Sequence, residues 1–483
     1  KIKKELKEVK SIDELCSVLD NRLSPHTKRG LNSGNLILQP TKERRKSGSH
    51  YTPRSLTEPI VKETFRPWLE ENKNEINAHK ILNLKVCDPA MGSGAFLVAS
   101  CRFLSELLVK AWNRDGFPSE FDESVDKDNY ARRLVAQNCL YGVDKNPFAV
   151  NLAKLSLWLV TLSKDLPFTF VDHALKSGDS LIGCSLNEIK RARENIQLSL
   201  IDSDNQFISK VCLEREANFA LDNRDDIAYD AKKKLLDEQF LATDEIRKTG
   251  DLMVAAFFNV FKSRDIYEKE KEYLSMIINS SHDRVLTESI NSIIKKLNSG
   301  EKAIKPFHWE LEFPEIFGKS REGFDIFIGN PPFAGKNTIS SIYPNRIFDW
   351  LKKANPESHG NADVVAHFFR RSFQLLRKNG SLGLIATNTI SQGDTRSTGL
   401  RWICLNGGDI FSARKRFKWP GIAAVIVSIV HLKKGGFLGK KILDGKHIER
   451  ITAFLLSSGI HEDPKRLISN INKSFQGCVV LGM

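Results

Sequence analysis

The stretch VCDPAMGSGAFL, residues 86–97, decides the fold. A short apolar run ends at Asp88, Gly92 and Gly94 follow it, and an apolar pattern with helical spacing starts directly after them. Glycine adopts backbone conformations that a Cβ hinders, and it lets a ligand come close to the main chain. The spacing therefore predicts a buried strand, a tight turn and a helix, with Asp88 at the carboxyl end of the strand.

This turn differs from two common nucleotide-binding motifs. Leu97 stands where the third glycine of a GxGxxG dinucleotide motif is required, and the stretch has no phosphate-loop lysine. An acidic residue at the end of the strand suits a cationic amino group better than a pyrophosphate.

Strand-like and helix-like segments alternate on both sides of the turn. Strands are predicted at 84–89, 140–144, 324–330 and 381–388, and an amphipathic helix before the last of them is expected to stop at Gly380. Such alternation predicts an α/β fold with a doubly wound, mostly parallel sheet.

Composition limits the classes of partner and compartment. The formal net charge is +14, which favours a polyanionic partner. The 8 cysteines include no CxxC pair, so neither a disulfide framework nor a metal site is expected, and a cytoplasmic protein is predicted. The apolar run 423–432 is far shorter than the ~20 residues of a membrane helix, and no membrane partner is expected.

Two more acidic residues follow strand or turn signals. Asp144 ends the strand in LYGVDKNP and suits ribose hydroxyls, and Asp179 in SGDSLIG suits an adenine amine. A ligand with an amino acid, a ribose and an adenine would use Asp88, Asp144 and Asp179 together.

The segment IGNPPF ends another buried strand with Asn330, Pro331, Pro332 and Phe333. Proline donates no hydrogen bond to a sheet and restricts the residue before it, so the strand has a stiff exit. Open α/β sheets place their chemistry at such exits.

These motifs, in this order, resemble those of γ-class N6-adenine DNA methyltransferases, which use S-adenosylmethionine. The match covers about residues 45–435, from GSHYTP through DPAMGSGAF, YGVDKNP, GDSL and IGNPPF to FKWPGIAAVIVSIV. The agreement around GSHYTPRSLTEPIV and HWELEFPEIF is similar to large type IIG restriction–modification proteins and to DISARM and BREX phage-defence methylases. The length of the insertion between the motifs leaves an α-type arrangement open.

The resemblance implies the class I methyltransferase fold and a division of the chain into five parts. These are a basic helical segment at 1–45, a cofactor-binding half at 46–184, a charged helical insertion at 185–305, a catalytic half at 306–435, and the start of a C-terminal, target-recognition region at 436–483. Because the chain starts with lysine and ends abruptly, we expect a fragment of a longer protein.

The resemblance also assigns site residues. Asn330, Pro331, Pro332 and Phe333 are the expected catalytic residues. The expected cofactor-binding residues are Tyr51, Thr52, Pro53, Asp88, Pro89, Ala90, Gly92, Gly94, Asp144, Lys145, Asp179 and Ser180. Phe333 and Phe417, with Trp419 as the alternative to Phe417, are expected to stack on a flipped-out adenine.

The expected partner is double-stranded DNA, with other subunits of a defence system as further candidates. Arg44, Arg45, Lys46 and the run ARKRFK at 413–418 are candidate phosphate contacts. Two alternative functions stay open: a methyltransferase of the same fold acting on RNA or protein glutamine, and a non-catalytic DNA-binding scaffold. The basic charge and Phe333 favour DNA adenine over the first, and the intact DPAMGSG and NPPF motifs argue against the second.

Overall fold

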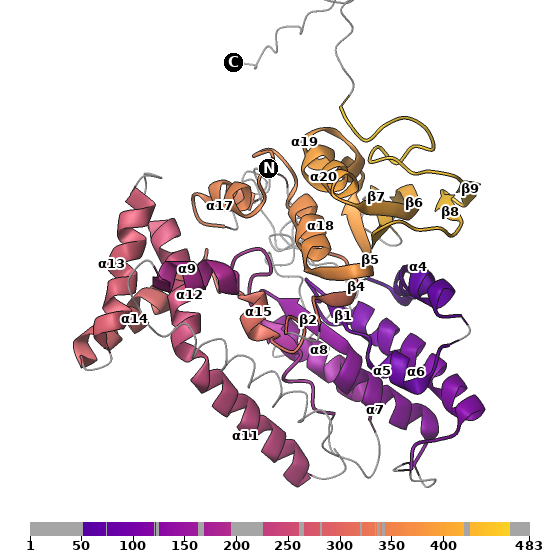
Figure 1. The fold of residues 1–483 in the computed structure, drawn as a ribbon, viewed down its shortest axis with the longest axis horizontal. Helices are drawn as coiled ribbons and strands as arrows, with labels where there is room; N and C mark the ends of the chain where they lie inside the picture. Colours follow the sequence, from indigo (N-terminus) through magenta and orange to yellow (C-terminus); the bar gives the residue numbers. More distant parts are fainter. Residues whose placement is uncertain are drawn as a thin grey trace, which may run out of the picture. The chain divides into compact units, whose positions relative to one another are not determined.

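A sheet of nine strands runs through the part of the chain that the structure describes, in the order β3-β2-β1-β4-β5-β7-β6-β8-β9 (Figure 1). The computed structural model describes residues 52–463 apart from 74, 120, 122–124, 163–168, 195–225, 260–264, 281–282, 319–320, 334, 336–338, 341–342 and 420–425. The predicted segment 1–45, which contains Arg44 and Arg45, lies outside the described residues, as do Lys46 and Tyr51.

Parallel pairing dominates the sheet. Parallel neighbours are β3 (Leu175–Ser177), β2 (Leu140–Asp144), β1 (Val86–Asp88), β4 (Phe324–Gly329) and β5 (Leu376–Thr387). Strand β7 (Ile426–Lys434) is antiparallel to both β5 and β6 (Gly408–Lys418), while β8 (Lys441–Leu443) and β9 (Lys446–Ile448) extend the edge. The predicted mostly parallel α/β sheet is confirmed.

Apolar clusters cover both faces of the central strands, and successive side chains of each strand enter opposite clusters. Val86 and Ile328 pack into one apolar cluster, and Cys87 and Phe327 pack into the other. The first cluster includes residues of α4 (Arg54–Glu71), α5 (Ala78–Leu82), α6 (Ala95–Asp115), α7 (Lys127–Cys139) and α8 (Pro147–Val160). The second includes residues of α15 (Trp309–Glu312), α18 (Val364–Leu375) and α20 (Trp402–Leu405), and of the segment 451–455.

A group of helices between β3 and β4 lies to one side of the sheet (Figure 1). They are α9 (Leu186–Glu194), α11 (Asp226–Ala242), α12 (Asp244–Asn259), α13 (Asp265–Ser280) and α14 (Arg284–Leu297). Of these, α9, α12, α13 and α14 share a third apolar cluster with α17 (Ile347–Ala354) and with Phe368 of α18. The short helices η1 (Asn388–Ser391), α19 (Gly393–Arg396) and η2 (Ser397–Arg401) follow β5.

The hairpin that joins β8 to β9 turns at Asp444 and Gly445, with φ angles of 49° and 81° at these two residues. The prediction that Gly380 stops a helix is wrong, because α18 ends at Leu375 and Gly380 lies within β5. A Cβ at Gly380 would lie 2.8 Å from the Asp325 carbonyl oxygen of the neighbouring β4, so close strand packing explains this glycine.

A largely buried carboxylate joins the helices between β3 and β4 to the sheet. Glu312 accepts a hydrogen bond from Lys176 Nζ of β3 at 2.8 Å and another from Arg247 Nε of α12 at 3.0 Å. Burial acts to raise the pKa of Glu312, but the two cations outweigh it and hold that pKa well below its usual range. The ionised carboxylate therefore cross-links β3, α12 and α15.

We expect Glu312→Gln to lower the free energy of unfolding by about 3 kcal/mol or more, because it leaves two largely buried cations without a counter-charge. Urea titration followed by circular dichroism measures the change. The control is Glu288→Gln, which removes an exposed carboxylate paired with Arg284 on α14. That substitution should change the stability by at most about 0.5 kcal/mol, and equal losses in both variants would contradict the cross-link.

Candidate cofactor and catalytic site

The turn between β1 and α6 forms the floor of the site. Asp88 ends β1 and is only 1% exposed. Gly92 and Gly94 have φ angles of 53° and 81°, in the left-handed region that side chains disfavour. A Cβ placed on Gly92 would meet no atom within 4 Å, so the turn borders open space. Helix α6 begins at Ala95 without a side-chain cap, which leaves its first N–H groups available to an anionic ligand.

Backbone hydrogen bonds tie this turn to the end of β2. Met91 N donates to Val143 O at 3.0 Å, and Gly92 N donates to Asp144 Oδ2 at 2.9 Å. The other carboxylate oxygen of Asp144 accepts from Asn146 N at 2.8 Å. Asp144 is thus held rigidly beside the glycine turn.

The third acidic residue, Asp179, lies two residues beyond β3 and is 2% exposed. Its Oδ1 accepts a hydrogen bond from Leu181 N at 3.1 Å. Its Oδ2 is buried, and Lys145 Nζ lies 3.7 Å away. Ser180 Oγ donates to Pro89 O, which connects this segment to the turn after β1.

Tyr343 also belongs to this corner of the site, although the sequence analysis did not select it. Lys145 Nζ lies 3.8 Å from the centre of the Tyr343 ring. Burial, with the charges of Asp179 and Asp144, raises the pKa of Tyr343 well above its usual value. An aromatic residue soon after the NPPF motif was the only available signal.

Asn330 lies directly beside the glycine turn. The preceding residue, Gly329, packs so closely on β1 that a Cβ there would be 2.5 Å from Asp88 Oδ1. Asn330 Nδ2 donates to Thr52 Oγ1 at 3.2 Å, and Thr52 is buried. Asn330 Oδ1 is buried and has no hydrogen-bond donor among the described residues. The site therefore contains a fixed amide whose acceptor oxygen is unused.

The three candidate stacking residues differ in exposure. Phe333 is partly buried and packs against the apolar clusters of both faces of the sheet. Phe417 is half-buried near the end of β6. Trp419 is 7% exposed and belongs to the apolar core together with Val427. Phe417, rather than Trp419, has surface left for a ligand.

Most of the predicted site residues meet at one edge of the sheet. The carboxyl ends of β1, β2 and β4 and the turn after β3 supply Asp88, Asp144, Asn330 and Asp179. Pro53 caps α4, Ala90 N donates to Asp88 Oδ1 at 3.0 Å, and Pro331 is buried after Asn330. The edge matches the position at which open α/β sheets bind ligands.

Burial controls the charge of the acidic residues in this site. It raises the pKa of Asp88 to about 8; the Ala90 N–H opposes this shift and the Asp144 carboxylate adds to it. Burial also raises the pKa of Asp144, against the hydrogen bonds from Asn146 and Gly92. A cationic group bound here would favour the ionised form of both carboxyl groups.

Among the described residues, no group of three or more His, Cys, Asp or Glu side chains is arranged to hold a metal ion. No helix in the described ranges has the length and apolar character needed to span a membrane.

The donor and acceptor set fits S-adenosylmethionine. The open glycine turn gives room for a ligand at the backbone, and the uncapped start of α6 suits a carboxylate. Asp88 suits an ammonium group, Asp144 suits hydroxyl groups, and the buried Oδ2 of Asp179 suits an amine hydrogen.

The chain matches two protein families. Residues 138–406 match the family described as Eco57I restriction-modification methylase, and residues 69–181 match the MmeI DNA-methyltransferase domain. The resemblance to restriction–modification methylases is confirmed, and with it S-adenosylmethionine as the methyl donor.

Two curated relatives are described as restriction enzymes and methyltransferases. RM.MjaORFECS2P of Methanocaldococcus jannaschii, described as a type II restriction enzyme and methyltransferase, is 25% identical over 416 residues, covering 72% of this chain and 32% of that protein. RM.Eco57I of Escherichia coli is 28% identical over 161 residues, covering 31% of this chain and 16% of that protein. The chain thus spans about a third of the archaeal relative and about a sixth of RM.Eco57I.

Solved structures similar to this chain include MmeI, a type IIL restriction-modification enzyme in complex with DNA, and the M protein of the type I restriction enzyme EcoKI. The MmeI structure has a TM-score of 0.45 and 17% identity, covering 87% of this chain and 43% of that chain. The EcoKI M protein has a TM-score of 0.34 and 11% identity, covering 83% of this chain and 48% of that chain.

The raised pKa of Asp88 predicts that the ligand-free protein loses stability as pH rises from about 4 to about 8. In that window the folded state keeps a proton that the unfolded state has released, so the stabilising contribution disappears as pH passes the folded-state pKa. Asp88→Asn should remove this dependence, and its melting temperature relative to wild type should rise between pH 5 and pH 8.

Thermal unfolding followed by circular dichroism at several pH values measures this difference. Asp237→Asn is the matched control, since Asp237 is exposed on α11. Its plot of melting temperature against pH should run parallel to that of the wild type. A parallel curve for Asp88→Asn as well would refute the raised pKa.

Proposed function

Because the chain belongs to the Eco57I restriction-modification methylase family, we propose that it transfers a methyl group from S-adenosylmethionine to N6 of an adenine in DNA. The observation that carries this proposal is the buried, unused Oδ1 of Asn330, held beside the Asp88 turn by the close packing of Gly329.

The chemistry needs hydrogen-bond acceptors rather than a strong base. The exocyclic amine of adenine is a weak nucleophile because its lone pair is delocalised into the ring. Asn330 Oδ1 and the Pro331 carbonyl oxygen would each accept one amine hydrogen, which favours a pyramidal nitrogen with a directed lone pair. Pro331 and Pro332 stiffen the backbone around these acceptors, so the arrangement acts by positioning and electrostatic preorganisation.

When bound, S-adenosylmethionine supplies an electrophilic methyl group on a sulfonium. Asp88 would hold the ammonium of its methionine end, and the N–H groups at the start of α6 would hold the carboxylate. Asp144 would accept from the ribose hydroxyls, and Asp179 Oδ2 from the adenine amine. Lys145 and Tyr343 border this last position, so they would contact the adenine end.

An adenine within a duplex does not reach a site at the edge of a sheet, so the base would be flipped out at a cost of a few kcal/mol. Phe333 and Phe417 would stack on the extruded base, and base–aromatic stacking stabilises by about 1–3 kcal/mol per base. Double-stranded DNA is therefore the proposed partner, and bacterial restriction–modification or phage defence is the proposed setting, together with other subunits of such a system.

We expect Asn330→Ala to lower the rate of methyl transfer by about 10²–10³-fold or more, because it removes a preorganised group that contacts the reacting amine. Labelled S-adenosylmethionine and unmodified plasmid DNA, followed by nucleoside analysis, measure the transfer. The wild type should form N6-methyladenine, and the affinity of the variant for the cofactor should be unchanged. Label found in RNA or protein, or in N4-methylcytosine, would refute the substrate assignment.

The hydrogen bond from Asn330 to Thr52 gives Thr52 a positioning role besides its expected contact with the cofactor. Thr52→Val keeps the shape but removes the hydroxyl, so the Asn330 amide would rotate and kcat should fall about 10-fold. Thr52→Ser keeps the hydroxyl and should retain kcat within about 3-fold. Isothermal titration with the cofactor provides the second measurement. A raised cofactor Kd with unchanged kcat in Thr52→Val would show that Thr52 serves the cofactor alone.

A further inference from the structure

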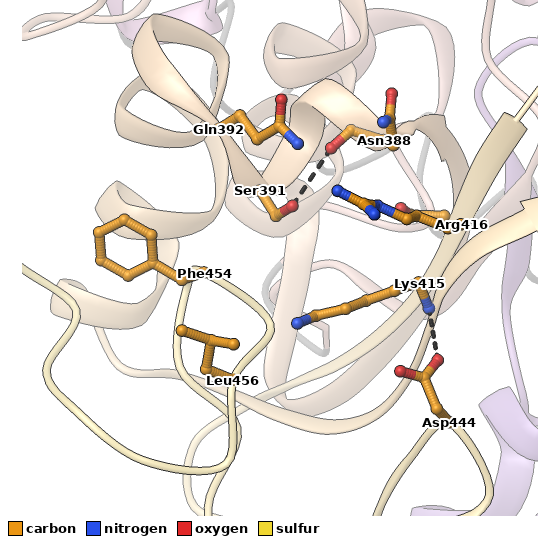
Figure 2. Close-up of a pocket in the computed structure, with 9 residues that line it drawn as sticks. Asn388, Ser391, Gln392, Lys415, Arg416, Asp444, Phe454 and Leu456 are labelled. Carbon is orange, nitrogen blue, oxygen red and sulfur yellow. Dashed lines mark hydrogen bonds between the residues drawn. The ribbon is translucent and has the colours of Figure 1, made fainter.

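A cavity of about 420 Å³ lies where β5 ends and η1 begins (Figure 2). Its walls include Asn388, Gln392, Lys415, Arg416, Phe454 and Leu456. In Figure 2 the side chains of Lys415 and Arg416 extend into the space between the two amides and the two apolar residues. None of the residues assigned above to the cofactor or to the target amine lines this cavity.

The cavity shares the carboxyl edge of the sheet with Asn330. Gly329 of β4 pairs with Leu384 of β5, so Asn388 lies three residues beyond the level of Asn330. At about 3.3 Å per strand residue, this offset is about 10 Å. Ser428, which also lines the cavity, alternates with Val427 and Ile429, which pack on the opposite face of the sheet. The cavity is therefore near the catalytic edge but separate from the face on which Phe417 packs.

A bulge in β6 aims two cations into the cavity. Arg414 pairs with Ile429 and Phe417 with Val427, so Lys415 and Arg416 together face Ser428 alone. Arg416 has a φ of 48°, a strained conformation for a bulky side chain. Bulges of this kind redirect side chains and are frequent next to binding sites.

The β8–β9 hairpin braces this bulge. Asp444 Oδ1 accepts a hydrogen bond from Lys415 N at 2.7 Å, and Asp444 N donates to Ala413 O at 2.9 Å. Among the described residues that line the cavity, Asp444 is the only one with a carboxylate, and this carboxylate accepts a hydrogen bond from the main chain. Neither Lys415 nor Arg416 forms an ion pair with a described residue, and the neighbouring Arg414 and Lys418 are exposed on the same strand. The cavity wall thus carries the two positive charges of Lys415 and Arg416 against the single carboxylate of Asp444 among its described residues.

The opposite wall is also fixed. Ile451, Ala453 and Leu455 are buried in the core, so the alternate residues Phe454 and Leu456 face the cavity. The Arg396 guanidinium lies 3.9 Å from the centre of the Phe454 ring, and Arg396 is itself paired with Asp463. The cavity therefore combines a cationic wall, two side-chain amides and a rigid apolar wall.

We propose that this cavity binds a nucleotide of the DNA strand that carries the target adenine. Lys415 and Arg416 hold a phosphate, and Asn388 and Gln392 contact the edge of the neighbouring base, for which amide side chains are well suited. A DNA strand is favoured over a free nucleotide because Asn388, in the cavity wall, lies only about 10 Å further along the strand direction than Asn330, at the same end of the sheet. This assignment rests on the proposed function for its choice of nucleic acid.

The test uses the double variant Lys415→Gln/Arg416→Gln and a fluorescein-labelled, mixed-sequence duplex, with binding followed by anisotropy over a range of salt concentrations. We expect DNA affinity to fall about 10-fold and the slope of log K against log salt to decrease by about 1–2. Affinity for S-adenosylmethionine should stay unchanged. The matched control, Lys295→Gln/Lys296→Gln, removes the same charge from exposed positions of α14.

An equal loss of DNA affinity in the two double variants would overturn the proposal, because it would show that only the net charge of the protein matters. Saturable binding of ATP that the Lys415/Arg416 variant loses, with DNA binding retained, would overturn it in favour of a free nucleotide. Arg416→Gly provides a second check on folding, because glycine tolerates a φ of 48° and should leave the melting temperature unchanged or higher. We expect this folded variant to lose DNA affinity as well.

The two hypotheses fail separately. A wild-type protein that binds the duplex but transfers no methyl group would refute the proposed function, while the binding experiment would still decide the role of the cavity. A protein that forms N6-methyladenine but whose DNA affinity is insensitive to Lys415 and Arg416 would refute the cavity assignment alone.

Discussion

The contact between Gly329 and Asp88 is the constraint on which the rest of the site depends. The last residue of β4 fits against the carboxylate at the end of β1 only because it has no side chain. This contact fixes Asn330 immediately after the strand and beside the glycine turn. Any larger residue at 329 would push the two strand ends apart, and the amide would lose its relation to the cofactor-binding turn.

The carboxyl-edge site was largely predictable because parallel strands place their carboxyl ends on one edge. The strands that end at Asp88, Asp144 and Gly329 are recognisable in the sequence. The polar side chains at or directly after these strand ends are therefore expected to be neighbours. The start of β5 was not predictable, since Leu376 pairs with Phe324, a residue remote in sequence. Local periodicity favoured a continued helix there, and tertiary pairing overrode it.

Side-chain partnerships across the sheet could not be deduced from the sequence. HYTP resembled a cofactor-binding segment, and nothing local indicated that Thr52 would accept a hydrogen bond from Asn330. The basic run at 413–418 was visible, but the bulge that separates Lys415 and Arg416 from their neighbours depends on the register of β6 against β7. Tyr343 reaches Lys145 only through the folded arrangement of two distant segments.

The charge cluster of Lys176, Glu312 and Arg247 has a consequence for the evolution of this architecture. Arg247 belongs to the helices between β3 and β4, whereas Lys176 is part of the sheet itself. In a descendant protein without these helices, Glu312 would keep only Lys176 as a cationic partner, and its side chain would be more exposed to solvent. Shortening this region should therefore be accompanied by compensating replacements at 176 and 312, and a graft of the helices onto another scaffold would need to carry all three positions with it.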